Sequence, residues 1–352
     1  MTVPSIELRP GYRISRVIRG GWQLAGGHGA VDRDEAVEDL AAFCEAGIVT
    51  FDCADIYTGV EDLIGTFRER HARRHGEAAL AGVKVHTKLV PDLDLLPTLK
   101  RHHVRAIVEQ SLRRLRMDRL DLVQFHWWDY AAPGYLEALG WLDEMRREGK
   151  VEHIGGTNFD AAHTLEMIAA GFPLVSMQVQ YSLLDDRPTH GLAGAALANG
   201  MRLFCYGSVA GGFLSDRWLG AAEPAGPFEN RSLTKYKLII DDFGGWGLFQ
   251  ELLAALRAIA DRLGSDIATV ASAAMLDAPA VAAVIVGARD RSHLAANVAI
   301  GAVRLDAADH AAIRAVTDRR AGPAGDTFAL ERDRTGRHGS IMRFNENAKV
   351  AS

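Results

Sequence analysis

Short apolar runs alternate along the chain with longer amphipathic segments. The runs are rich in β-branched and aliphatic residues, as buried parallel strands are, and the longer segments repeat apolar positions at helical spacing. Strands are predicted at residues 17–21, 49–52, 83–87, 120–126, 151–157, 174–178, 202–206 and 283–287. The clearest helices are predicted at residues 34–46, 104–115, 135–148, 248–263 and 293–300.

Glycines support the predicted helix ends. Gly47, Gly149 and Gly264 stand where a helix commonly ends on a residue with a left-handed backbone. Eight strand–helix units without a break in composition predict an α/β fold with a parallel sheet, and the simplest closed form is the (β/α)8 or TIM barrel. We expect one domain over residues 1–352, with its core at about residues 16–318.

A doubly wound dinucleotide-binding sheet is the alternative arrangement. Such a sheet carries Gly-x-Gly-x-x-Gly in its first strand-to-helix turn, with an acidic residue about 20 positions later. The early glycines Gly26, Gly27 and Gly29 do not match that spacing. The sequence therefore favours the barrel.

Two long segments depart from the repeating pattern. Residues 213–247 lengthen the loop after the seventh strand and contain Pro224, Pro227 and several aromatic residues. We predict that this loop acts as a clamp over a cofactor or substrate. The C-terminal tail, residues 319–352, is charged and has no strong period, so both a lid and a disordered segment stay open.

Four titratable side chains lie at or near the carboxyl ends of consecutive predicted strands. Asp52 ends the second strand, Tyr57 follows it by five residues, Lys88 ends the third strand and His126 ends the fourth. Each residue alone has an ordinary explanation in a turn, in packing or at the surface. Catalytic groups of such barrels lie at this face, however, so we predict that these four residues are catalytic.

These groups suit the transfer of a proton to a carbonyl oxygen. The Tyr57 phenol has an ordinary pKa of about 10, and the Lys88 ammonium, held by Asp52, is expected to lower it. Tyr57 then acts as a general acid, while His126 donates a hydrogen bond that orients the carbonyl. Because none of these side chains supplies a hydride, the reaction requires a nicotinamide cofactor.

Three segments resemble a known family. The sequences FDCADIY at residues 51–57, HTKL at 86–89 and QFHW at 124–127 are similar to signature segments of the aldo-keto reductase superfamily. The resemblance runs from about residue 19 to residue 297 in the same order. It implies a (β/α)8 barrel that binds NADPH without a Rossmann domain and reduces aldehydes or ketones to alcohols, with Tyr57 as the proton donor.

The resemblance also implies contacts to the cofactor at other strand ends. Thr157, Asn158 and Gln178 match residues that hold the nicotinamide amide, and Tyr206 matches the aromatic residue that stacks on the ring. Residues 207–214 resemble the pyrophosphate loop but depart from the commoner Tyr-Ser-Pro-Leu form. The predicted cofactor-binding residues are Gly21, Trp22, Asp52, Thr157, Asn158, Gln178, Tyr206, Gly207, Ser208, Val209, Gly211, Gly212, Leu214, Arg217, Gly287, Arg289, Arg291, His293 and Asn297.

Two arginines after the eighth strand bear on the choice of cofactor. Gly287 precedes a predicted helix start, where free N–H groups and the helix dipole attract phosphate. Arg289 and Arg291 flank this point and can pair with a 2′-phosphate, although both could instead lie on a solvated helix face. The resemblance assigns Asn297 to the adenine. NADPH is therefore predicted in preference to NADH.

Aromatic residues near the strand ends predict the wall of a substrate pocket. Aromatic walls favour apolar or cyclic carbonyl compounds, so a bulky cyclic ketone is a candidate substrate. Packing in the core is the alternative role for the same side chains. The predicted pocket residues are Trp22, Tyr57, His126, Trp127, Trp128 and Tyr130.

Charge and composition argue against several other classes of protein. The net charge of −5, with both signs mixed along the chain, leaves no basic stripe for nucleic acid or a membrane surface. Three scattered cysteines are too few for a disulfide framework or a zinc knuckle. With neither a signal peptide nor an apolar run of about 18 residues, we expect a cytoplasmic protein, its oligomeric state unknown.

Two further functions compete with carbonyl reduction. A barrel of the same fold could bind NADP as a redox sensor or regulatory subunit with little turnover. A metal-dependent hydrolase or isomerase could use some of the 13 histidines, but neither His-x-His nor His-Glu-x-x-His occurs. No metal site is therefore predicted.

Overall fold

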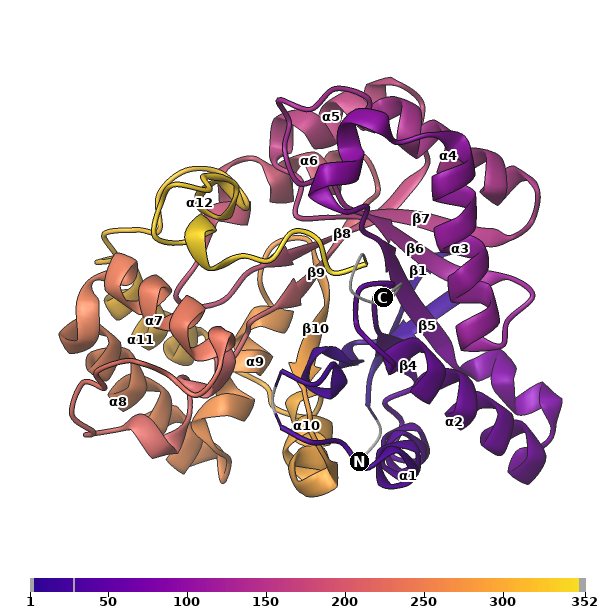
Figure 1. The fold of residues 1–352 in the computed structure, drawn as a ribbon. Helices are drawn as coiled ribbons and strands as arrows, with labels where there is room; N and C mark the ends of the chain where they lie inside the picture. The colour runs from indigo at the N-terminus through magenta and orange to yellow at the C-terminus, as the bar shows by residue number, and fades with distance from the viewer. Residues whose placement is uncertain (1–2, 28, 348–352) are drawn as a thin grey trace.

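Eight parallel strands close into a barrel in the computed structural model of the chain (Figure 1). Residues 3–27 and 29–347 are described, so the last five residues of the predicted tail, 348–352, lie outside this range. All eight predicted strands are present, with small differences at their ends, which confirms the TIM barrel. They are β3 (Val17–Gly20), β4 (Thr50–Asp52), β5 (Lys84–Leu89), β6 (Leu120–Phe125), β7 (Val151–Thr157), β8 (Leu174–Gln180), β9 (Arg202–Tyr206) and β10 (Val281–Gly287).

Helices surround the barrel, and the short α12 belongs to the C-terminal tail. They are α1 (Arg33–Glu45), α2 (Val60–His75), α3 (Arg101–Leu115), α4 (Tyr135–Arg147), α5 (Ala161–Ala169), α6 (Leu192–Ala198), α7 (Arg231–Phe243), α8 (Gly245–Leu263), α9 (Ile267–Leu276), α10 (Leu294–Ile300), α11 (Ala307–Thr317) and α12 (Ala329–Arg332). Gly47, Gly149 and Gly264 have positive φ angles of 94°, 81° and 60°, as predicted for helix ends. Within the described part of the chain, no helix is long and apolar enough to span a membrane.

A hairpin closes the amino end of the barrel. Its strands, β1 (Ser5–Arg9) and β2 (Tyr12–Ser15), are antiparallel and were not predicted from the sequence. The Tyr12 hydroxyl lies 3.1 Å from Nε2 of His86, and Tyr12 belongs to an apolar cluster with Leu122 and Phe204. Because this end is filled, only the carboxyl ends of the strands are left to form a site.

The connection after β9 differs from the predicted long loop. Within residues 213–247 the chain forms α7, whose first turn is capped by the Asn230 side chain accepting the Leu233 N–H. Tyr236, Ile239, Ile240 and Phe243 recur at helical spacing and are buried in a second apolar cluster with α8. This amphipathic period is short and lies among prolines and aromatic residues.

The C-terminal tail lies across the carboxyl ends of the strands, where Figure 1 shows it in yellow. Arg332 Nη2 donates to the backbone oxygens of Trp127 and Asn158, at 3.1 and 2.8 Å. Further along, Phe344 O accepts the Leu93 N–H, and Asn347 Nδ2 donates to Val90 O. The tail is therefore joined to loops that follow three different strands.

Candidate active site

Asp52 and Lys88 form a buried ion pair at the carboxyl end of the barrel. Lys88 Nζ donates to Asp52 Oδ2 at 2.7 Å and to the Cys53 backbone oxygen at 2.8 Å. Asp52 is 3% exposed and Lys88 5% exposed. Their positions follow from neighbouring strands, because Asp52 ends β4 and Lys88 lies near the end of β5. Burial lowers the pKa of Lys88, but the charges of Asp52 and Tyr57 raise it by more. The net pKa is therefore above its ordinary value, and Lys88 remains an ammonium.

Two glutamine side chains complete the hydrogen bonds of Asp52. Its Oδ1 accepts from Gln124 Nε2 at 3.0 Å and from Gln178 Nε2 at 2.6 Å. Gln178 also donates to Gln124 Oε1 at 3.0 Å, so the three side chains form a closed network. Sequence reasoning assigned no role to Gln124, although it lies opposite Lys88 in the register of β5 and β6.

Tyr57 lies beside this ion pair. The Lys88 Nζ atom is 4.9 Å from the centre of the Tyr57 ring, which is 5.1 Å from the Trp22 ring. Burial raises the pKa of Tyr57, and although Lys88 opposes this effect, the net pKa lies above its ordinary value. Lys88 thus lowers the pKa of Tyr57 as predicted, but the net shift is upward, because loss of hydration disfavours phenolate more than the ammonium stabilises it.

His126 is buried one residue beyond the end of β6. Its Nδ1 lies 3.0 Å from the Thr157 backbone oxygen, and its Nε2 has no hydrogen-bond partner among the described residues. Burial and then the Arg332 charge lower its pKa to about 3, so the ring is neutral near pH 7. Because a carbonyl oxygen only accepts, Nδ1 carries the proton and Nε2 offers a lone pair. The predicted donation from His126 to a carbonyl requires a proton on Nε2, which the neutral ring protonated at Nδ1 lacks.

The residues expected to hold a nicotinamide gather beside this group. The Tyr206 hydroxyl donates to Asn158 Oδ1 at 2.9 Å, and the Asn158 N–H donates to the Gln178 backbone oxygen at 2.9 Å. Thr157 Oγ1 donates to the same oxygen at 3.2 Å. Asn158 has a φ of 63°, in the left-handed region that asparagine adopts more readily than most residues. Gln178 reaches this cluster through its backbone, while its side chain is engaged by Asp52.

The glycine-containing loop after β9 packs against α7. Gly207, Gly211 and Gly212 have φ angles of 78°, 65° and 101°, which favour glycine. A Cβ atom on Gly207 or Gly211 would overlap Tyr236, so this close approach also requires glycine. The backbone around Val209 is therefore positioned by contact with α7.

Other predicted residues of this loop have packing roles. Ser208 Oγ lies 3.1 Å from Ser272 Oγ and is buried. Leu214 belongs to the apolar cluster of α7 and α8. Arg217 lies 5.1 Å from the centre of the Trp218 ring, in a short turn that precedes α7.

The segment after β10 forms one side of a surface pocket. Gly287 lies against the Gln23 side chain, and a Cβ atom on Gly287 would overlap it. At the barrel rim, the Gly21 N–H donates to the Asp52 backbone oxygen at 2.7 Å. Asn297 is 8% exposed, and its Nδ2 has no hydrogen-bond partner within the described chain. His293 is exposed at the start of α10.

The predicted aromatic wall is only partly brought together. The Trp128 ring lies 4.3 Å from the His126 ring, and Trp22 Nε1 donates to Ser232 Oγ of α7 at 3.3 Å. Trp127 is 1% exposed and donates from Nε1 to Ala132 O, which places it in the packing behind the site.

Tyr130 is engaged on both faces of its ring. It stacks on His163 at 3.5 Å, and the Arg332 guanidinium carbon lies 4.0 Å from its ring centre. It therefore supports the C-terminal tail more directly than it lines a pocket.

Tail and α7 residues complete the site, and sequence reasoning missed them. The Phe328 ring lies 5.7 Å from the His126 ring, and the Phe344 ring lies 5.2 Å from that of Trp128. Lys235 of α7 lies 5.1 Å from the Tyr206 ring centre. The tail offered no periodic signal, whereas the spacing of Tyr236 and Ile240 could have revealed α7 and hence Lys235.

The arrangement fits a nicotinamide dinucleotide. The Tyr206 ring, the Asn158 amide and the close-packed glycine backbone offer stacking and hydrogen-bonding surfaces. Nδ2 of Asn297 is buried and has no partner among the described residues. Among the described residues, no group of three or more His, Cys, Asp or Glu side chains could hold a metal ion.

Several known proteins are similar to this chain. A family model described as the Aldo/keto reductase family matches residues 16–318. Flagellar radial spoke protein 5 of Chlamydomonas reinhardtii is 29% identical over 261 residues, which cover 64% of this chain and 49% of that protein. The chain thus spans about half the length of this relative.

Other relatives match along most of their own length. The NADH-specific methylglyoxal reductase of Escherichia coli (strain K12) is 26% identical over 333 residues, covering 87% of this chain and 95% of that enzyme. A solved structure of the thermostable aldo-keto reductase Tm1743, in complex with the inhibitor epalrestat, is 25% identical. The similarity covers 89% of this chain and 99% of that chain, with a TM-score of 0.69.

Proposed function

The chain belongs to the aldo/keto reductase family, and on this premise we propose that it reduces the carbonyl group of an aldehyde or ketone to an alcohol. The observation that carries the proposal is the buried Lys88–Asp52 ion pair, 2.7 Å long, with Lys88 Nζ 4.9 Å from the Tyr57 ring centre. This grouping joins a proton donor to a cation that stabilises its conjugate base.

Tyr57 holds and delivers the proton. Its raised pKa keeps the phenol protonated at neutral pH, which is the form needed to donate to a carbonyl oxygen. Lys88 stabilises the phenolate left behind, and Asp52 fixes the position of Lys88. His126 offers the Nε2 lone pair, which accepts a hydrogen bond from the hydroxyl of the alcohol.

A reduced nicotinamide, when bound, supplies the hydride that these side chains lack. The residues proposed to hold it are Asn158, Gln178 and Tyr206, with the backbone of residues 207–212 beside its phosphates. The sequence favoured NADPH, whereas the Escherichia coli relative is described as NADH-specific. A small carbonyl compound as substrate and a cytoplasmic location are part of the same proposal.

The decisive experiment compares Tyr57→Phe with Tyr135→Phe. Tyr135 is on the outer helix α4, away from the ion pair, and is a matched control for loss of a phenolic hydroxyl. The rate of cofactor oxidation is followed as the decrease in absorbance at 340 nm with aldehydes, dicarbonyls and cyclic ketones. This rate should be at least about 100-fold lower in Tyr57→Phe. Cofactor affinity should stay within a few-fold, and Tyr135→Phe should keep its activity.

Two outcomes contradict this proposal. Full turnover in Tyr57→Phe would remove Tyr57 as the donor. Tight dinucleotide binding by the unaltered protein without turnover of any carbonyl would favour the sensor function.

A further inference from the structure

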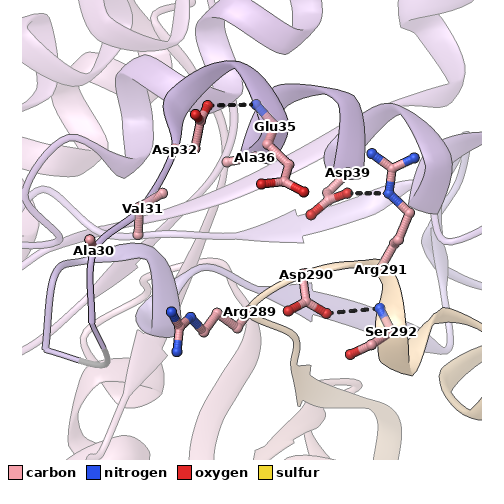
Figure 2. Close-up of a pocket in the computed structure, with 10 residues that line it drawn as sticks. All are labelled: Ala30, Val31, Asp32, Glu35, Ala36, Asp39, Arg289, Asp290, Arg291 and Ser292. Carbon is pink, nitrogen blue, oxygen red and sulfur yellow. Dashed lines mark hydrogen bonds and ion pairs between the residues drawn. The ribbon is translucent and has the colours of Figure 1, made fainter.

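A pocket of about 430 Å³ lies between the start of α1 and the segment after β10 (Figure 2). If the proposed function holds, this pocket receives the adenosine end of the dinucleotide, which the sequence resemblance assigns to residues 287–297. Four carboxylates and two guanidinium groups line it. They belong to Asp32, Glu35, Asp39, Asp290, Arg289 and Arg291.

Arg291 is already paired with an acid. Its Nε donates to Asp39 Oδ1 at 2.6 Å, and the Asp39 side chain is 2% exposed. The buried Arg19 interacts with Asp39 as a second cation: burial lowers its pKa to about 10, while Asp39 and Asp290 oppose that change. Arg291 and Arg19 therefore both compensate the negative charge of Asp39.

Arg289 lies apart from Arg291. Its guanidinium is beside Gly29, and Figure 2 shows the two guanidinium groups at opposite ends of the pocket. They do not form one clamp around a phosphate, which needs its donors to converge. The carboxylates of Asp32, Glu35 and Asp290 line the same pocket, so even with Arg19 counted the pocket has more negative than positive charges.

Asp290 supplies a negative charge at the turn after β10. The residue caps the short turn Arg291–His293, and its Oδ1 accepts the Ser292 N–H at 2.8 Å. Hydrogen bonds from Ser292 lower the Asp290 pKa, so the side chain is a carboxylate at neutral pH. A phosphate at this turn would compete with a negative charge that the chain itself supplies.

We propose that this pocket accepts an adenosine ribose without a 2′-phosphate, so that the chain prefers NADH to NADPH. Carboxylates accept hydrogen bonds from ribose hydroxyls, whereas a 2′-phosphate brings nearly two further negative charges. The proposal rests on the proposed function, because it assigns the pocket to a dinucleotide. It reverses the preference predicted from Arg289 and Arg291, which was made without the acids that the fold brings beside them.

Direct binding tests the proposal without turnover. Tryptophan fluorescence titrations should give a dissociation constant for NADH about tenfold lower than for NADPH at low salt. Calorimetry with 5′-AMP and 2′,5′-ADP isolates the adenosine end and should show the same order. Raising the salt from about 0.01 M to about 0.5 M should narrow the NADH preference, because screening weakens repulsion. A salt effect that weakens NADPH more than NADH would overturn the proposal.

Charge-removing variants locate the effect. The double variant Glu35→Gln and Asp290→Asn keeps a capping side chain at position 290 and should strengthen NADPH binding about fivefold, with little change for NADH. Asp34→Asn is the matched control, since Asp34 is on the same turn of α1 but pairs with Arg70 outside the pocket. An equal gain in Asp34→Asn would assign the effect to overall charge and overturn the proposal.

Binding and turnover together distinguish failure of the cofactor preference from failure of the proposed function. Tighter binding of NADPH than of NADH, with carbonyl turnover intact, would overturn the cofactor preference and leave the proposed function standing. Binding of neither dinucleotide would overturn the proposed function and the preference together.

Discussion

Replacement of Glu331 by Gln should release the C-terminal tail from the barrel mouth. Both oxygens of Glu331 accept from Arg187, Oε2 from Nη1 at 2.9 Å and Oε1 from Nη2 at 3.1 Å. Each side chain is 1% exposed. Lys235 Nζ lies 3.8 Å from the same carboxylate, and Asp185 binds Arg187 from the other side at 2.7 Å. Glu331 therefore joins the tail to two parts of the barrel.

The expected loss is about 2 kcal/mol. Removing one partner of a buried pair costs about 3–5 kcal/mol when the other charge is left alone. Asp185 still pairs with Arg187 in Glu331→Gln, so the loss is closer to that of one or two charge-assisted hydrogen bonds, about 1.5–3 kcal/mol each before relaxation. A change of this size raises the population of the detached tail roughly 30-fold.

Hydrogen exchange resolved by peptide measures this population. Exchange of the amides in residues 326–347 should accelerate roughly 30-fold in Glu331→Gln, while exchange in the barrel strands stays unchanged. Glu251→Gln is the matched control, because Glu251 pairs with Arg319 through both oxygens on an exposed surface. Unchanged exchange in the tail of Glu331→Gln would refute the reasoning.

The pH dependence gives a further check on Glu331. Burial raises its pKa, but Arg187 and Lys235 outweigh burial and lower the pKa to about 2. A lowered carboxyl pKa contributes stability above the ordinary value of about 4.3, and this stability is lost as the pH falls through about 2. The protection of the tail amides against hydrogen exchange, after correction for the intrinsic exchange rate, should therefore not change between pH 5 and pH 8.

Three other substitutions test the packing and charge of the barrel. Gly65→Ala should destabilise by about 2–3 kcal/mol, because its Cβ would overlap the Arg114 backbone oxygen. A Cβ on Gly140 would meet only Phe172, at an ordinary van der Waals distance of 3.9 Å, so Gly140→Ala should stabilise by about 0.5–1 kcal/mol. Urea unfolding that shifts stability in the same direction for both variants would contradict this. Burial raises the Asp55 pKa to about 8, so stability falls as the pH rises from about 4 to about 8. Asp55→Asn should abolish that fall in urea unfolding at pH 5 and 8.5, and an unchanged fall would exclude Asp55 as its source.

The strand pattern was predictable because it depends on local sequence. Runs such as residues 151–157 and 202–206 are apolar, short and bounded by turns, and the structure has strands at those same residues. Once the barrel is assumed, topology places every strand end on one rim, so Asp52 and Lys88 meet although 36 residues separate them. Their contact could therefore be predicted without knowledge of how the side chains pack.

Contacts between segments far apart in the chain could not be predicted in this way. Arg291 and Asp39 are 252 residues apart, and neither lies in a motif that names the other as its partner. From the sequence alone, each of the two residues is interpreted as an exposed charge on a helix. The pairing follows from the packing of α1 beside the segment after β10, which only the folded chain defines.

The protonation state of the site depends on the tail for the same reason. Within the barrel, the hydrogen bond to Thr157 raises the pKa of His126, while burial and Arg332 lower it to about 3. Arg332 reaches this position because Glu331, its neighbour in α12, is anchored to Arg187. The strand ends thus supply the reacting groups, and the tail sets the charge of one of them. A sequence reading that treats the tail as a separate segment therefore omits the effect of Arg332 on the pKa of His126.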